Sequence, residues 1–333
     1  KAGEIMPDVS SKWSTADGNE TELGGVAGEV SLVRDKVWAQ TANNSTSLEA
    51  FNKTNISAAD LNVKNDTERN ALVDWALGKS ETDNTTLRLD LLGDPLHSTP
   101  QVVNYGGTVG PVGFFGTNEG FLHAFQLDPI AKEMFSFMPY SLQPNLTKFK
   151  DPESTTDPHP YGLDGYISVL VRDNNGDGKL VKTSEENSDK VIVIVGMRRG
   201  GNNFYALDVT NPSAPALLWE VTGGATGFEK LGQSWSRPVI SKMYKPNTTD
   251  IVDVVLFTGG YDTGYDNTEG EKYPVPGTPT GNAIYAVDLN NGSLVWSSDN
   301  DSTLAGQMKH ATPAGLTAVD VTQDGVVDLA YAI

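Results

Sequence analysis

Short apolar segments separated by glycine-rich turns recur along this chain, and three of the segments are nearly the same. The three segments are Leu122–Asp128, Phe204–Thr210 and Ile284–Asn290. Each holds an Ala between larger side chains, and their aspartates Asp128, Asp208 and Asp288 are spaced 80 residues apart. A glycine-rich turn precedes each segment, and an aromatic strand pattern follows it. A sheet unit that repeats at a long period is typical of a β-propeller.

Further apolar segments of strand length fill the intervals between the repeats. They are Gln101–Tyr105, Pro111–Gly116, Lys190–Gly196, Arg237–Ser241 and Asp253–Phe257. Within each unit the order is apolar strand, glycine turn, aromatic-Ala strand, Asp turn, and Trp or Phe strand. This order matches the second, third and fourth strands of a four-stranded blade. The sequence therefore predicts an all-β propeller in which the repeated glycines and aspartates form turns rather than a catalytic site.

One helical pattern interrupts the strands near residues 66–78. Asp66 or Thr67 is the predicted N-cap, an apolar stripe follows, and Gly78 ends the helix. We expect the whole of 42–90 to be a loop-and-helix insertion, preceded by a strand over Val30–Thr41. Residues 1–29 are polar and are expected to be loosely ordered.

The charge balance excludes some classes of partner. The chain has 24 Lys and Arg against 43 Asp and Glu, a net charge of −19. It should repel nucleic acid and anionic membrane surfaces and attract cations. There is no cysteine, which excludes disulfides, a thiol nucleophile and thiolate metal sites. No apolar run is long enough to span a bilayer.

The two ends of the sequence predict that the chain is part of a larger protein. It starts at Lys1 without a signal-peptide pattern and stops at Ile333 inside an apolar run. We therefore expect residues 1–333 to be a single propeller domain cut from a larger protein.

The first candidate metal site is the oxygen-rich segment Asp173–Lys179. Asp173, Asn175 and Asp177 would supply side-chain oxygens, and Lys179 would supply a backbone carbonyl at the seventh position. This is the D-x-N-x-D-G start of a calcium loop, in which alternate residues converge on one cation. The ninth residue is Val181 and the twelfth is Ser184. Water, Glu185 or Glu186 would therefore have to complete the ligand shell.

The second candidate metal site is the segment Asp320–Asp328. Asp320, Thr322, Asp324 and Asp328 fall at positions one, three, five and nine, and the carbonyl of Val326 falls at position seven. Thr in place of Asp or Asn at the third position weakens the site. A strand is predicted directly after the loop. The alternative for both loops is an ordinary Asp/Asn/Gly turn that binds no metal.

Other catalytic and binding motifs are absent from the sequence. The four histidines form no zinc-binding pair, and His123 is expected in the core or at a blade edge. There is no nucleophile elbow and no P-loop. Arg198 and Arg199 form a basic pair in a blade turn, for which partner binding is a hypothesis.

Several motifs of the chain resemble the C-terminal domain of the PilC/PilY proteins, the tip-associated adhesins and biogenesis factors of type IV pili. They are Trp75–Gly78, Leu92–Pro100, Gly120–Phe125, Gly196–Thr210, Leu231–Pro238, Gly281–Asp288 and Asp320–Tyr331. They occur in the same order as in the family, and the resemblance extends over roughly residues 70–333. The resemblance implies a modified seven-bladed, quinoprotein-like propeller of a secreted protein. In the family, a calcium loop of the D-x-[DN]-x-D-G type couples calcium to pilus extension and retraction.

Carried over residue by residue, the resemblance gives Asp173, Asn175 and Asp177 the calcium loop, with Asp320–Asp328 as a second candidate. Family loops usually end in Asp at the ninth position, and Val181 departs from that pattern. The strand expected over Val30–Thr41 could complete the last blade, because propellers often close by pairing the two ends of the chain.

The main hypothesis is thus a non-enzymatic, calcium-binding propeller at a pilus tip or outer cell surface. Minor pilins or the pilus tip complex would be its partners, with a host-surface ligand as a further expectation. Pilus extension, twitching motility and adhesion are the processes implied. The alternatives are a quinone-dependent dehydrogenase on a similar propeller, and a structural scaffold that does not use calcium.

Overall fold

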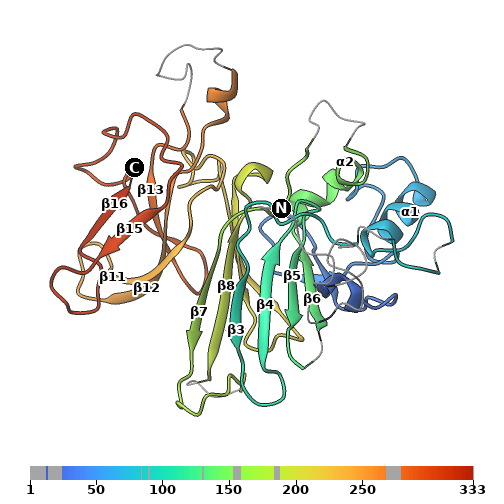
Figure 1. Cartoon of the computed structure of the whole chain (residues 1–333). Coiled ribbons are helices and arrows are strands. Elements are labelled where there is room, and N and C mark those ends of the chain that lie inside the picture. Colours follow the sequence, from blue (N-terminus) through green and yellow to red (C-terminus); the bar gives the residue numbers. More distant parts are fainter. Residues whose placement is uncertain are drawn as a thin grey trace, which may run out of the picture.

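The computed structural model describes residues 13, 25–83, 85–88, 91–129, 131–152, 159–183, 188–267 and 279–332. Strands dominate, and they form successive antiparallel units that follow one another along the chain (Figure 1). This arrangement confirms the predicted all-β propeller, whereas the seven blades remain a prediction. Most of the segment expected to be loosely ordered, residues 1–29, lies outside the described residues.

Each complete unit is a four-stranded meander in which sequential strands pair. The first unit contains β3 (Gln101–Asn104), β4 (Pro111–Gly116), β5 (Leu122–Gln126) and β6 (Lys132–Met138). The second contains β7 (Ile167–Arg172), β8 (Lys190–Gly196), β9 (Asn203–Asp208) and β10 (Ala216–Thr222). The third contains β11 (Val239–Tyr244), β12 (Ile251–Thr258), β13 (Ile284–Asp288) and β14 (Leu294–Ser297). The pair β15 (Leu316–Val319) and β16 (Leu329–Ala332) follows.

The repeated segments occupy the same place in each unit. They are the third strands β5, β9 and β13, as the sequence predicts. The aspartates that end two of them also act as predicted: Asp208 Oδ1 accepts the N–H of Thr210 at 2.9 Å, and Asp288 Oδ1 accepts the N–H of Asn290 at 2.8 Å. The repeat therefore encodes both a strand and the turn that follows it.

The strand predicted over Val30–Thr41 is shorter and lies elsewhere than expected. Only β1 (Val37–Gln40) is a strand, and it pairs in parallel with β6 of the first unit. A short strand that was not predicted, β2 (Leu48–Ala50), adds to β1. The prediction that this strand completes the last blade is thus wrong. The outer edge of the first unit offers it hydrogen bonds and a buried apolar surface instead.

The predicted helix is confirmed, with one change at its start. It is α1 (Asp66–Ala76), and its N-cap is Asn65, whose side-chain oxygen accepts the N–H of Glu68 at 3.0 Å. Gly78 lies just beyond the end with φ +87, as expected of a residue that stops a helix. A second, short helix α2 (Leu146–Lys150) lies near it, preceded by the 3-10 helix η3 (Tyr140–Asn145).

Neighbouring units are joined by buried hydrogen bonds from side chains to backbone carbonyls, and by close contacts between side chains and backbone. Trp219 of the second unit donates its Nε1–H to the carbonyl of Leu289 in the third, at 2.8 Å. Gly292 lies against that indole with φ +70, and a Cβ there would stand 2.8 Å from Trp219 Cγ. Tyr105 likewise donates its hydroxyl to the Val209 carbonyl at 2.6 Å. Glycine is therefore needed at 292 for the units to pack this closely.

Candidate metal centre

The two acidic loops occupy equivalent places in the fold. Loop 1 (residues 173–189) joins β7 to β8, and loop 2 (residues 320–328) joins β15 to β16. Each is thus the connection between the first two strands of its unit. The β7–β8 turn points to the lower end of the propeller in Figure 1, opposite the 3-10 helix η5 (Arg198–Gly200). Equivalent turns of successive blades emerge at one end of a propeller.

The two loops turn left-handed at the same two positions, although their sequences differ. The fourth and sixth residues are left-handed in both. Gly176 and Gly178 have φ +70 and +73 in loop 1, and Gln323 and Gly325 have φ +61 and +84 in loop 2. Gly178 and Gly325 therefore supply the sharp turn that a calcium loop needs at its sixth position.

The first aspartate organises each loop in the same way. In loop 1, the Asp173 carboxylate accepts the N–H groups of Gly176 at 2.7 Å and Gly178 at 2.8 Å. In loop 2, Asp320 accepts the N–H of Gln323 at 2.6 Å and of Gly325 at 2.7 Å. Both carboxylates thus accept from the fourth and sixth amides and hold the loop closed on itself.

The fifth residue repeats the pattern, whereas the third does not. Asp177 Oδ1 accepts the N–H of Lys179 at 2.8 Å, and Asp324 Oδ1 accepts the N–H of Val326 at 2.9 Å. At the third position, Asn175 Oδ1 accepts the N–H of Asp177 at 3.0 Å. Thr322 behaves differently, because its hydroxyl donates to Asp328.

The ninth position of loop 2 is filled by Asp328, which lies directly before β16. Its Oδ2 accepts the N–H of Val321 at 2.7 Å, the N–H of Thr322 at 2.9 Å and the hydroxyl of Thr322 at 3.1 Å. A carboxylate therefore closes this loop against its own second and third residues.

Asp189 takes the corresponding place in loop 1, which the spacing of the calcium-loop pattern does not reveal. It lies directly before β8, is 6% exposed, and accepts the N–H of Asn174 at 2.8 Å and of Val181 at 3.0 Å. Both Asp189 and Asp328 thus accept the amide of the second loop residue. The available signal was an acidic residue immediately before the next strand. Glu185 and Glu186, the candidates for the rest of the ligand shell, lie outside the described residues, as does Ser184 at the twelfth position.

Both closing carboxylates stay ionised at neutral pH. The N–H groups of Val181 and Asn174 lower the pKa of Asp189 below its usual range. The N–H of Thr322 is the main reason that the pKa of Asp328 is lowered as well, despite some opposing burial. Each loop therefore has a negatively charged closing residue. In loop 1 this charge comes from Asp189, because the ninth residue by count is the uncharged Val181.

Each loop also bonds to the unit before it. The eighth residue of loop 1, Leu180, donates its N–H to the carbonyl of Tyr105 at 3.0 Å, next to β3. The eighth residue of loop 2, Val327, donates to the carbonyl of Lys242 on β11 at 2.8 Å. Tyr244, also on β11, donates its hydroxyl to Asp324 at 3.3 Å. The conformation of each loop is therefore coupled to the contact between two blades.

The donor atoms of both loops suit a hard cation such as calcium, because they are carboxylate, amide, hydroxyl and carbonyl oxygens. Within the part of the chain that the structure describes, no three acidic or histidine side chains are gathered closely enough to hold a metal ion. The backbone is in place, but the carboxylates bond to loop amides. Cation binding would have to turn some of these side chains inward.

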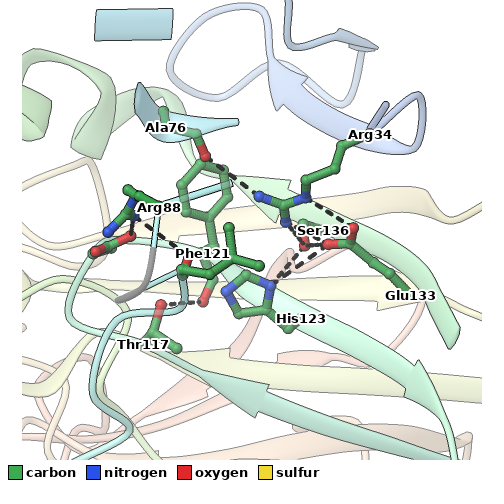
Figure 2. Close-up of polar contacts among 10 residues, drawn as sticks. Arg34, Ala76, Arg88, Thr117, Phe121, His123, Glu133 and Ser136 are labelled. Carbon is green, nitrogen blue, oxygen red and sulfur yellow. Dashed lines mark hydrogen bonds and ion pairs between the residues drawn. The ribbon is translucent and has the colours of Figure 1, made fainter. Parts of the chain in front are cut away.

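A buried polar cluster contains the residue types of a hydrolase triad (Figure 2). Ser136 donates its Oγ–H to Glu133 at 2.6 Å and contacts His123 Nδ1 at 2.7 Å, while Arg34 bonds both oxygens of Glu133. A triad needs the histidine between serine and acid, but here the serine lies between the other two. Burial alone would raise the pKa of Glu133, but the charge of Arg34 outweighs it and holds the pKa well below its usual range. The cluster anchors the segment before β1 to the first unit.

Two other features of the described residues bear on function. His123 is 2% exposed and lies in β5, as expected of a core residue. None of the helices in the described ranges has the length and apolar character needed to cross a bilayer.

The family model of the PilY1 beta-propeller domain matches residues 89–333. The type IV pilus biogenesis factor PilY1 of Pseudomonas aeruginosa strain UCBPP-PA14 is 26% identical over 293 residues, which cover 80% of this chain and 22% of that protein. A PilY1 homolog of Xylella fastidiosa is 32% identical over 200 residues, covering 57% of this chain and 14% of that protein. The chain thus spans between about a seventh and about a fifth of the length of these relatives. The crystal structure of the P. aeruginosa PilY1 C-terminal domain covers 68% of this chain and 37% of that chain, with TM-score 0.42 and 22% identity.

Proposed function

The chain belongs to the PilY1 β-propeller family, and we propose that it is the calcium-responsive, non-enzymatic propeller of a type IV pilus biogenesis factor. The observation that carries the proposal is the repeated loop geometry. Two loops far apart in sequence share left-handed fourth and sixth residues, a capping first aspartate and a closing carboxylate. Ordinary turns need no such common set of oxygen donors.

Calcium, when bound, would supply a positive charge that competes with the loop amides for the carboxylates. The residues of this chain would transmit that change. The N–H groups of Leu180 and Val327 tie the loops to the preceding units, and the Tyr244 hydroxyl ties Asp324 to β11. Ordering of a loop would therefore stiffen a contact between blades. A cation that binds only the folded state also stabilises that state.

We place the protein outside the cell, at the pilus tip or on the outer surface as part of the fimbrium. Its partners would be minor pilins or the tip complex, and a surface ligand of a host is an additional candidate. In this setting, the calcium-dependent blade contact would bias pilus extension against retraction and so affect twitching motility and adhesion. The acidity of the chain, with a net charge of −19, suits calcium capture and disfavours nucleic acid.

The test is a calorimetric calcium titration of chelator-stripped protein, with Asp177→Ala and Asp324→Ala in parallel. We expect saturable binding, with one site lost in each variant, because the fifth-position carboxylate is a direct ligand of such loops. The same substitutions, placed in the full-length gene, should alter twitching motility. Absence of binding by the parent protein would overturn the calcium proposal.

Two further measurements separate the proposal from its rivals. Turnover of alcohols with added pyrroloquinoline quinone would overturn the non-enzymatic assignment in favour of a dehydrogenase. A melting temperature that does not respond to calcium, together with normal motility of both variants, would favour a structural scaffold.

A further inference from the structure

A strip of arginine and aromatic side chains lies at the end of the propeller opposite the acidic loops. Arg198 and Arg199 belong to η5, between β8 and β9, at the upper end in Figure 1. Trp235 lies between β10 and β11, and Tyr261 follows β12. Connections of two units therefore meet in one strip, although they are distant in sequence.

The strip is held by stacking. The guanidinium carbon of Arg198 lies 4.4 Å from the ring centroid of Trp235, and that of Arg199 lies 5.2 Å from it. The rings of Trp235 and Tyr261 are stacked at 4.5 Å with an interplanar angle of 18°. Arg199 also lies 5.8 Å from the ring centroid of Tyr161. Each arginine is thus positioned by a flat aromatic surface rather than by a charge.

Backbone and amide contacts fix the strip further. Trp235 donates its Nε1–H to Gln233 at 3.0 Å, and Gln233 donates in turn to the carbonyl of Arg199 at 3.2 Å. Arg198 has φ +52, a left-handed backbone conformation that residues other than Gly, Asn and Asp seldom adopt.

The two guanidinium groups have no carboxylate partner among the described residues. Arg198 is half-buried and Arg199 is exposed. The buried arginines do have such a partner: Arg34 pairs with Glu133, and Arg88 pairs with Glu119 at 2.6 Å. In a chain with 43 acidic residues, this absence is notable. A stacked guanidinium keeps its N–H edge available for bidentate bonds to a carboxylate.

A shallow hollow of about 380 Å³ continues the strip. Tyr261 belongs to both, because it stacks on Trp235 and lines the hollow. The remaining lining residues are Tyr265, His310, Ala311 and Pro313. The hollow is largely apolar and can accept a bulky apolar side chain.

We propose that the strip and hollow bind a segment of a partner protein that carries carboxylates beside a bulky apolar residue. Arginine, Trp and Tyr are the residues enriched at the energetic centres of protein interfaces. A uronic-acid polysaccharide would satisfy the arginines but has no apolar group for the hollow. The surface is distinct from the acidic loops, and none of its residues belongs to a candidate calcium site.

The test is fluorescence anisotropy with a labelled peptide of Glu residues that contains Leu and Phe, measured in chelator. We expect binding that strengthens at low salt. The double variant Arg198→Gln/Arg199→Gln should weaken it by about tenfold, since each loses charge-assisted bonds to the ligand. Tyr265→Ser, which keeps the charge, should weaken it by about threefold through loss of apolar contact.

The matched control is Lys242→Gln/Lys245→Gln, which removes the same charge from exposed residues on β11 and in the turn after it. It should leave the affinity for the peptide unchanged. Each variant is first shown to melt at the same temperature as the parent protein. Three outcomes would overturn the proposal. They are no binding by the parent protein, equal weakening by the control, and polygalacturonate binding as tightly as the peptide. Because the assay contains chelator, its failure would not bear on the calcium loops.

Discussion

Loop 1 and loop 2 reach the same arrangement by different sequences, and only one of them could be recognised in full. In loop 2 all side-chain positions lie within Asp320–Asp328. In loop 1 the first seven residues follow the same pattern, but the closing carboxylate is Asp189, beyond an insertion that starts at Val181. The loops therefore differ in how far the chain travels before the last acidic residue.

The difference shows that the closing carboxylate is placed by the next strand and not by its distance along the loop. Asp189 immediately precedes β8, and Asp328 immediately precedes β16. Antiparallel pairing with β7 and β15 fixes where those strands begin. The residue before each strand therefore arrives beside the start of the loop, whatever the number of residues between.

The largest expected effect comes from the closing carboxylates themselves. Asp328→Asn and Asp189→Asn should each reduce the calcium affinity of their own loop by about tenfold or more, because a charge that holds the cation is removed. The measurement is calorimetry in an Asp177→Ala background for loop 2 and an Asp324→Ala background for loop 1. Asp301→Asn is the control, since Asp301 also caps a turn, through the N–H of Thr303 at 2.8 Å. If Asp189→Asn left the calcium affinity of loop 1 unchanged, the two loops would not be equivalent.

A smaller effect is expected from making the two loops equal in length. Deleting residues 181–188 places Asp189 at the ninth position and gives loop 1 the pattern of loop 2. Closing the shorter loop costs about 0.6 kcal/mol less free energy, because fewer residues lose conformational freedom. This difference corresponds to roughly threefold tighter calcium binding. Calorimetry in the Asp324→Ala background measures it. A Gly/Ser replacement of the same length is the control and should bind as the parent does. Loss of binding on deletion would mean that the insertion itself supplies a ligand.

The smallest effect is expected in acid. The folded-state pKa values of Asp189 and Asp328 lie below the ordinary value of 3.8, so their stabilisation is complete above that value. It is lost as the pH falls through the folded-state values, because protonation removes the acceptors of the loop amides. Without calcium, the melting temperature should fall less steeply below about pH 4 in the Asp189→Asn/Asp328→Asn double variant than in the parent protein. Identical slopes would show that these carboxylates carry no such linkage.

Much of the fold could be predicted from the sequence because its signals are local. The strands β5, β9 and β13, the aspartate turns after two of them and the helix α1 depend on residues within a few positions of one another. The same holds for most of the two loops, since a first aspartate caps amides three and five residues later. Apolar periodicity, glycine turns and Asp caps are therefore sufficient to predict these elements.

The remaining features were decided only by the tertiary structure. The pairing of β1 with β6, the place of Asp189, and the strip of Arg198, Trp235 and Tyr261 all join residues that are distant in sequence. Nothing in the local pattern of such residues indicates which strand edge, amide or ring they will meet. Packing of whole units against one another determines those meetings, because it sets which backbone groups and aromatic faces are left for a distant segment to contact.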